Sequence, residues 1–160
     1  MIKMAKFRWK NLLFWVAITE AVGLFSGLIT RDGVKLFQQT VAQPPLSPPG
    51  WIFLVVWSIL YALMGVSASL VNQSMDAPMC RRGLNRMIAQ LILNFFWSPI
   101  FFNLQAYGLS LLWLIALWVV VFIMIRKFLQ CVPLAGKLQI PYLLWLSFAV
   151  YLNAGVLLLN

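Results

Sequence analysis

Five long runs of apolar residues, separated by short polar segments, dominate the chain. The runs cover residues 12–29, 51–71, 87–104, 107–125 and 138–158. Each is close to the roughly 20 residues that a helix needs to cross a bilayer. Apolar and polar positions do not alternate within the runs, so the strands of a membrane barrel are excluded. The pattern predicts an all-α integral membrane bundle of five transmembrane helices, formed by a single domain over residues 1–160.

Composition supports the membrane assignment. Hydrophobic residues make up 63% of the chain and charged residues only 9%, whereas a soluble domain carries about 25% charged residues. The basic N-terminus resembles the start of a signal peptide. The apolar run that follows is too long for a cleaved signal, contains Glu20 and lacks a small-residue cleavage site, so we interpret it as a retained span.

Basic residues predict the orientation of the bundle. Ten of the twelve Lys and Arg residues lie in the N-terminus and in the second and fourth connections, and only Arg31 and Lys35 lie on the opposite side. The positive-inside rule then places the N-terminus in the cytoplasm and the C-terminus outside. Because the cations follow this topology, we expect no nucleic-acid partner.

The residue inventory is poor for catalysis. The chain has no histidine, its two cysteines Cys80 and Cys131 lie in separate connections without metal-ligand spacing, and its three acids are far apart. We therefore expect no metal site, no cofactor and no acid–base catalytic pair. Glu20 lies in the middle of a span, where a carboxyl group is either a functional group or a hydrogen-bonded structural one.

The first connection, residues 30–50, is the longest and resembles a lid. Residues 43–49, which we call the strap, contain four prolines that favour a stiff, extended path. Before the strap, Val34, Phe37 and Val41 share one face of a short amphipathic turn. This segment is either an interfacial element that rests on head groups or part of a lid over a cavity.

Three of the predicted helices carry aromatic faces with few polar groups. Trp51 lies at the membrane boundary, where tryptophan is a common anchor. The helical spacing groups the remaining residues as Phe53, Trp57 and Tyr61; Asn94, Trp97 and Phe101; and Trp145, Ala149 and Leu152. These faces either pack the bundle or line a pocket for a flat hydrophobic ligand. Pro99 predicts a kink or opening in the third helix, and the GxxxG pair Gly23 and Gly27 predicts a close contact within or between chains.

Three ordered blocks carry a resemblance to a known family. They are PPLSPPGWIFLVVWSILYALMG at 44–65, AQLILNFFWSPIFF at 89–102 and IPYLLWLSFAVYLN at 140–153. Together they resemble the tryptophan-rich sensory protein and translocator protein family, also called the peripheral-type benzodiazepine receptor family, over nearly the whole chain. The resemblance, to bacterial members in particular, implies a five-helix bundle in a bacterial cytoplasmic membrane, often a homodimer. Such a bundle binds porphyrins, other tetrapyrroles and sterols between its helices under the first loop.

The resemblance also implies a ligand site. The matching positions are Trp57, Tyr61, Asn94, Trp97, Trp145, Ala149 and Leu152, and further lining would come from Trp51, Phe53 and Phe101. Tyr151 is followed by LNAGVLLLN with no basic residue, which departs from the sterol-recognition pattern of animal members. The small-residue pattern of some bacterial dimer interfaces is not clear around Ala89.

Three functions fit these features. The first is binding, and with it transport, of porphyrins or related flat ligands in the membrane. The second is an enzyme that degrades protoporphyrin with light and oxygen, in which Trp57 and Trp145 would match the tryptophans that the resemblance implicates. The third is a sensor that regulates tetrapyrrole metabolism or stress responses through a partner. The inventory favours binding, because no acid–base pair or metal site is visible.

Overall fold

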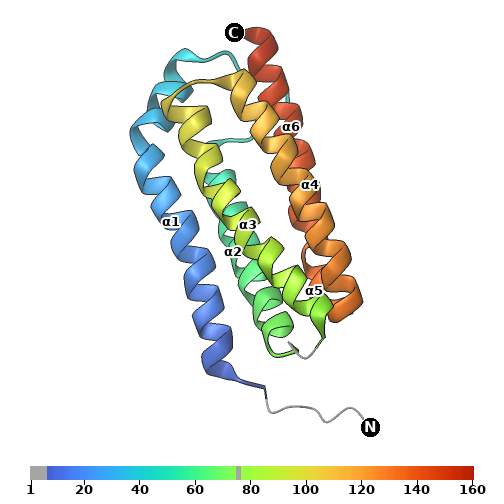
Figure 1. Ribbon diagram of the computed structural model, residues 1–160. Helices are drawn as coiled ribbons and strands as arrows, with labels where there is room; N and C mark the ends of the chain where they lie inside the picture. The colour runs from blue at the N-terminus through green and yellow to red at the C-terminus, as the bar shows by residue number, and fades with distance from the viewer. Residues whose placement is uncertain (1–6, 75–76) are drawn as a thin grey trace.

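Five long helices pack side by side in the computed structural model, which describes residues 7–74 and 77–160 (Figure 1). They are α1 (Trp9–Thr40), α2 (Gly50–Asn72), α3 (Pro78–Ser98), α4 (Tyr107–Cys131) and α6 (Ile140–Leu159). A π-helical segment, η1 (Pro99–Asn103), continues α3, and the short α5 (Pro133–Leu138) precedes α6. No strand occurs in the described residues. The all-α membrane bundle predicted from the sequence is confirmed.

Four stretches are long and apolar enough to cross a membrane: α1, α2, α4 and the stretch from Pro133 to Leu159. Helix α3 does not meet the same criterion within the described residues, because its first turns carry Arg81, Arg82 and Arg86. Its apolar half begins at Met87, where the third span was predicted. Helix α3 packs along α4, and together with η1 it runs the length of the bundle (Figure 1).

Helix α1 continues beyond the predicted first span. It contains 32 residues, which corresponds to about 48 Å of helix, more than the roughly 30 Å hydrocarbon core. Its last turns are held by Phe37, which is buried against Phe101 and Phe102 with ring centroids 5.3 Å apart in both pairs. The irregular part of the first connection is therefore confined to residues 41–49.

Pro99 opens the third helix as predicted. Proline has no N–H group and cannot donate a backbone hydrogen bond within the helix. The backbone widens here into the π-helical η1, in which Leu104 N donates to Pro99 O at 3.0 Å. The wider turn places Phe101 inward, where it is 4% exposed. Pro99 thus sets the direction of an aromatic side chain.

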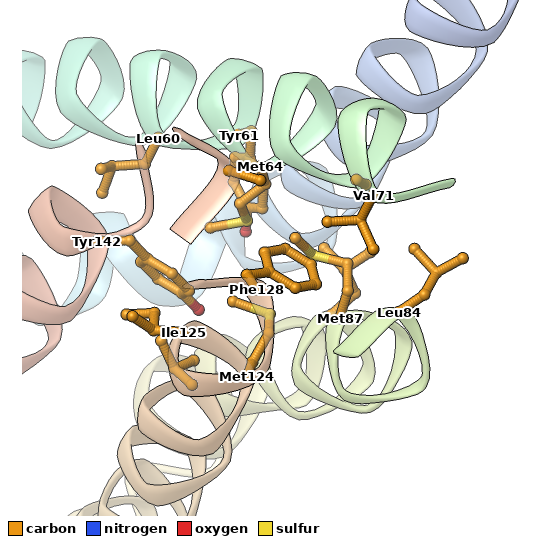
Figure 2. Close-up of a cluster of buried hydrophobic side chains, with 14 of the residues drawn as sticks. Leu60, Tyr61, Met64, Val71, Leu84, Met87, Met124, Ile125, Phe128 and Tyr142 are labelled. Carbon is orange, nitrogen blue, oxygen red and sulfur yellow. The ribbon is translucent and has the colours of Figure 1, made fainter. Parts of the chain in front are cut away.

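The main apolar core fills the half of the bundle that carries the basic clusters. Figure 2 shows Met64, Met87 and Met124 around Phe128, and all four side chains are fully buried. A smaller cluster of Phe37, Phe101 and Val156 lies toward the opposite end. Most of the predicted ligand-site residues belong to the main core or pack against it: Tyr61 and Ala149 are part of it, and Trp57, Trp97 and Trp145 pack on it.

Two glycines of α1 and α2 mark where these helices approach most closely. A Cβ atom on Gly65 would lie 2.5 Å from Val16 Cα, and one on Gly23 would lie 2.6 Å from Tyr61 Cδ2. Thr19 Oγ1 donates to Tyr61 O at 2.7 Å in the same region. Gly27, the second glycine of the GxxxG pair, faces open space. Only Gly23 of that pair therefore serves a contact within the chain.

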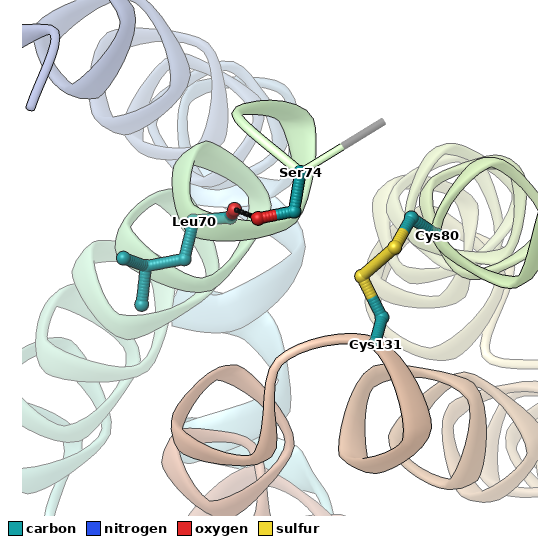
Figure 3. Close-up of a disulfide and its surroundings, with 4 residues drawn as sticks. All are labelled: Leu70, Ser74, Cys80 and Cys131. Atoms are coloured by element: carbon teal, nitrogen blue, oxygen red, sulfur yellow. Dashed lines mark hydrogen bonds between the residues drawn. A yellow bond between two sulfur atoms is a disulfide. The ribbon is translucent and has the colours of Figure 1, made fainter. Parts of the chain in front are cut away.

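A disulfide joins Cys80 in the first turn of α3 to Cys131 at the end of α4, with Cα atoms 5.2 Å apart (Figure 3). Helices α3 and α4 are antiparallel neighbours, so the start of one meets the end of the other. The two cysteines were expected in separate connections, and their pairing was not predicted. Both lie at the end of the bundle that carries Arg81, Arg82 and Lys127.

Candidate functional site

A buried polar network ties three helices together at the base of the predicted site. Tyr61 of α2 donates through its hydroxyl to Asn94 Oδ1 of α3 at 2.8 Å. Asn94 Nδ2 donates to Tyr142 Oη of α6 at 2.7 Å, and Tyr142 donates to Gln90 Oε1 at 2.8 Å. All four side chains are at most 5% exposed. Because each polar group is partnered, the network fixes the relative positions of α2, α3 and α6 inside the membrane.

Two members of this network were missed in the sequence. Gln90 precedes Asn94 by four residues, and Tyr142 precedes Trp145 by three, so each lies on a face already identified. Their polar groups at membrane depth were the signal that could have found them, since such groups usually point into the bundle.

Aromatic side chains lie next to this network, between α2 and α6. The ring of Trp57 lies 5.5 Å from that of Tyr61 and 6.1 Å from that of Tyr142, and Phe53 lies 5.6 Å from Trp145. The backbones of α2 and α6 make little close contact, in contrast to α1 with α2 or α3 with α4. Aromatic rings therefore hold α2 and α6 apart, and we call the space that they fill the α2–α6 seam.

One polar atom of the seam lacks a partner. The indole nitrogen of Trp145 is buried and makes no hydrogen bond to any described residue. An unpartnered N–H group in a dry site has an energetic cost that an acceptor on a ligand would remove. Ala149, one turn further along α6, is 8% exposed and leaves little bulk beside this ring.

The other predicted site residues lie further from the seam. Trp97 stacks on Phe101 with centroids 5.1 Å apart, and its indole nitrogen donates to Asn153 Oδ1 at 3.4 Å. This pair belongs to the aromatic cluster with Phe37. Leu152 is half-buried on α6, whereas Trp51 is 68% exposed at the start of α2. The structure thus gathers Phe53, Trp57, Tyr61, Asn94 and Trp145 closely and places Trp97 and Phe101 in the adjoining cluster.

The strap is attached to the carboxyl-terminal half of α6. Tyr151 donates to Pro45 O at 2.8 Å, and buried Pro44 lies so close to Gly155 that a Cβ atom there would be 2.5 Å from its ring. Just before the strap, Ala42 and Asn160 exchange two hydrogen bonds of 3.1 and 2.9 Å. The strap therefore has specific contacts with α6 on its way to the start of α2.

Side chains fill the candidate site in this structure. Tyr61, Asn94 and Ala149 are each less than a tenth exposed. Two open surface hollows lie elsewhere: one of about 410 Å³ between α1 and α3, and one of about 580 Å³ at the start of α1. A ligand in the α2–α6 seam would need Trp57, Phe53 or Trp145 to turn aside.

Comparison with known proteins decides the family. The sequence matches the model of the TspO/MBR family over residues 15–159. The chain belongs to the TspO/MBR family. It is 31% identical to the tryptophan-rich protein TspO of Chlorobaculum tepidum, over 94% of this chain and 96% of the relative.

Two further relatives from other organisms are also similar to the chain. The chain is 36% identical to protein CrtK of Rhodobacter capsulatus, over 84% of each protein. It is 30% identical to the human translocator protein, over 85% of this chain and 82% of the relative. The resemblance carried by the three sequence blocks is confirmed, and with it the assignment to an integral membrane family.

Proposed function

We propose that this TspO/MBR protein binds a flat, mostly hydrophobic ligand of the porphyrin or tetrapyrrole class in the α2–α6 seam. The observation that carries the proposal is the seam itself, in which rings of Phe53, Trp57 and Trp145 occupy the space between two helices that make little backbone contact. A flat ligand would replace these ring contacts with its own, so little aromatic packing would be lost on binding.

The polar groups of the seam suit such a ligand. The hydroxyl groups of Tyr61 and Tyr142 are engaged with Asn94 and Gln90, so a polar ligand would have to break a satisfied network. The free indole N–H of Trp145 offers one donor to a carboxylate or carbonyl group of the ligand. Because the chain has no histidine, binding would depend on stacking and burial instead of the usual axial ligation of haem iron.

Titration of the purified protein with protoporphyrin, followed by tryptophan quenching, tests the site. Trp57→Ala and Trp145→Ala should each weaken binding by about 2–4 kcal/mol, or roughly 30- to 1000-fold, if each ring contacts the ligand fully. Trp118→Ala is the matched control, since Trp118 lies on α4 and donates to Ser147 outside the seam. Wild-type affinity in both seam variants, or equal losses in all three, would show that the seam is only packing.

Light- and oxygen-dependent breakdown of protoporphyrin is the second candidate. It is favoured by Trp57 and Trp145, which place two electron-rich indoles on opposite helices of the proposed site. Incubation of the protein with protoporphyrin in light and in darkness, with and without oxygen, separates binding from degradation. The enzyme is favoured if the wild type loses the porphyrin absorption spectrum only in light with oxygen, and if Trp57→Ala and Trp145→Ala keep that spectrum under the same conditions.

A sensor role has support from a relative's name. A protein of Cereibacter sphaeroides that is 30% identical over 95% of this chain is called tryptophan-rich sensory protein. In such a role, ligand binding would change the exposed surface to which a regulatory partner binds. A pull-down from the native membrane that is unchanged by protoporphyrin would argue against it.

Orientation and assembly complete the proposal. The basic clusters favour a cytoplasmic N-terminus and an extracytoplasmic C-terminus, so a reporter fused at Asn160 should be active only outside the cytoplasm. We also propose a homodimer, as is often found in this family. Light scattering of the purified protein that gives the mass of one 18.3 kDa chain would contradict it.

A further inference from the structure

The cysteine pair lies where two helix ends of opposite polarity meet. Cys80 is in the first turn of α3 and Cys131 is the last residue of α4, and their Cα atoms are 5.2 Å apart (Figure 3). The N-terminus of a helix stabilises a negative charge, whereas the C-terminus opposes one. When the bond between the two sulfur atoms is broken, the helix ends therefore favour a thiolate on Cys80 and a neutral thiol on Cys131.

The surroundings of the pair reinforce this asymmetry. The first turn of α3 contains no acid, and its N-cap residue provides no side-chain hydrogen bond. Lys127 precedes Cys131 by one turn on α4, and its Cβ atom would lie 3.4 Å from a Cβ atom on Gly83, one turn after Cys80. Among the residues that the structure describes, Lys127 forms no ion pair. A cation thus adjoins the pair and favours the thiolate further.

The two cysteines also differ in exposure. Cys80 is only 2% exposed, whereas Cys131 is partly exposed at the end of α4. An external thiol therefore reaches the bond at Cys131, and Cys80 departs as the thiolate. Thiol–disulfide exchange is fastest when the attacked sulfur is accessible and the departing thiolate is stabilised. Attack at Cys131 meets both conditions.

The pair lies at the basic end of the bundle, which faces the cytoplasm in the orientation proposed above. Arg81, Arg82 and Lys127 belong to the same end. Glutathione and thioredoxin keep most cytoplasmic thiols reduced, and the disulfides that do occur there are mostly transient, catalytic or redox-sensing. In this orientation, a permanent structural disulfide is therefore not expected at this end.

We propose that Cys80 and Cys131 form a reversible redox site that exchanges, through Cys131, with small thiols and disulfides of the glutathione type. In oxidation, the Cys131 thiolate attacks the small disulfide, forms a mixed disulfide and releases one small thiolate. The Cys80 thiolate then attacks the Cys131 sulfur, which forms the protein disulfide and releases the second small thiolate. Two protein thiols and one small disulfide thus become one protein disulfide and two small thiols, and the protons pass through solvent. Reduction follows the same steps in reverse.

The bond controls how the start of α3 is held. Helix α5 follows Cys131 directly and attaches the end of α4 to α2, because Ser67 Oγ of α2 donates to Ala135 O of α5 at 3.1 Å. The oxidised pair ties the start of α3 covalently to this joint, whereas the reduced pair leaves it to noncovalent contacts. Hydrogen exchange over residues 78–84 should therefore be faster in the reduced protein. Equal exchange in the two forms would contradict this role of the bond.

Redox titration of the purified full-length chain tests the site. The wild type is equilibrated with glutathione and glutathione disulfide at ratios that span the cytoplasmic range, and its free thiols are then alkylated and counted by mass spectrometry. The pair should change from mostly oxidised to mostly reduced within that range. A pair that stays oxidised throughout would overturn the proposal in either orientation, because structural disulfides resist reduction by glutathione. A pair that stays reduced throughout would overturn it as well.

Variants test the direction of attack. Glutathione disulfide should modify Cys131 in the Cys80→Ser variant about 10-fold faster than Cys80 in the Cys131→Ser variant, because access limits the exchange. Lys127→Gln should slow reduction of the pair by β-mercaptoethanol, a neutral thiol, about 2- to 5-fold. Lys137→Gln, in the last turn of α5 at the same end of the bundle, is the matched control and should leave the rate unchanged. Faster modification of Cys80, or equal effects of the two lysine variants, would contradict the proposed path.

Acid quenching and alkylation of growing cells separate the redox site from the orientation on which its cytoplasmic role rests. The pair should be mostly reduced in untreated cells and oxidised after addition of diamide, a thiol oxidant. An oxidised pair in untreated cells, together with a reporter at Asn160 that is active only outside the cytoplasm, would overturn the switch. An oxidised pair with a reporter that is active in the cytoplasm would instead show that the orientation is wrong, while the titration still decides the chemistry of the pair.

Discussion

Gly23 allows close packing between α1 and the tyrosine of the buried network, so replacing it with alanine should disturb the site from outside. An alanine Cβ would lie 2.6 Å from Tyr61 Cδ2 and 3.1 Å from Cζ, whereas carbon atoms pack best at about 3.5–4.0 Å. The ring must therefore move by about 1 Å. It is held on its other side by Trp57 and by the hydrogen bond to Asn94.

The magnitude follows from three effects. Overpacking of a well-filled interior costs about 1–3 kcal/mol, and the weakened hydrogen bond costs about 1 kcal/mol more. The helix propensity of alanine over glycine recovers about 1 kcal/mol. We expect Gly23→Ala to lower the free energy of unfolding by about 1–3 kcal/mol. Gly27→Ala, one turn further along the same helix and facing open space, should be neutral or slightly stabilising.

Thermal unfolding in detergent, followed by tryptophan fluorescence and circular dichroism, measures the difference. Each kcal/mol should correspond to roughly 2–4 °C for a chain of this size. A Tyr61→Leu background provides a double-mutant cycle, since the smaller side chain can yield to the new methyl group. Equal stability of the Gly23→Ala and Gly27→Ala variants, or an effect of Gly23→Ala that persists fully beside Leu at position 61, would refute the reasoning.

Three further predictions concern the strap, the disulfide and the turn after η1. Tyr151→Phe removes the hydrogen bond to Pro45 O, so porphyrin should dissociate about 2- to 10-fold faster in stopped-flow fluorescence. The control is Tyr107→Phe, which removes a hydroxyl without a partner among the described residues and should leave the dissociation rate unchanged. Cys131→Ser should lower the unfolding free energy by about 2–4 kcal/mol, and a reducing agent should destabilise the wild type but not this variant. Gln105 adopts a left-handed φ of 49°, so Gln105→Gly should raise the unfolding temperature by relieving about 1 kcal/mol of strain, whereas Leu104→Gly, at a φ of −83°, should not.

The helices could be predicted because lipid leaves the backbone few alternatives. Apolar runs without alternation must be helical, and Pro99 had to disturb the ladder because it lacks an N–H group. The end of α1 was not predicted, since hydropathy reports where a membrane core ends and not where a helix ends. Arg31, Asp32 and Lys35 are compatible with a helix, and burial of Phe37 against η1 extends α1 to Thr40.

The site was predicted as a set of faces but not as a geometry. Spacing placed Trp57, Tyr61, Asn94 and Trp145 on inward faces, and the structure brings them close together. The spacing of residues could not show that side chains fill the seam, because side-chain rotamers depend on all neighbouring helices at once. The Cys80–Cys131 pair was missed for a similar reason: two residues 51 positions apart meet only once α3 and α4 are known to be antiparallel neighbours.

The disulfide also divides the bundle into parts with different freedom to move. The chain between Cys80 and Cys131 returns on itself through the tight turn after η1, so α3 and α4 form a covalently closed ring. Neither helix can swing away from the other at the basic end without breaking a covalent bond. Helices α2 and α6 lie outside this ring, and aromatic rings and the buried polar network lie between them. We therefore expect opening motions of the bundle at the α2–α6 seam, where the two helices can separate while the disulfide holds α3 and α4 together.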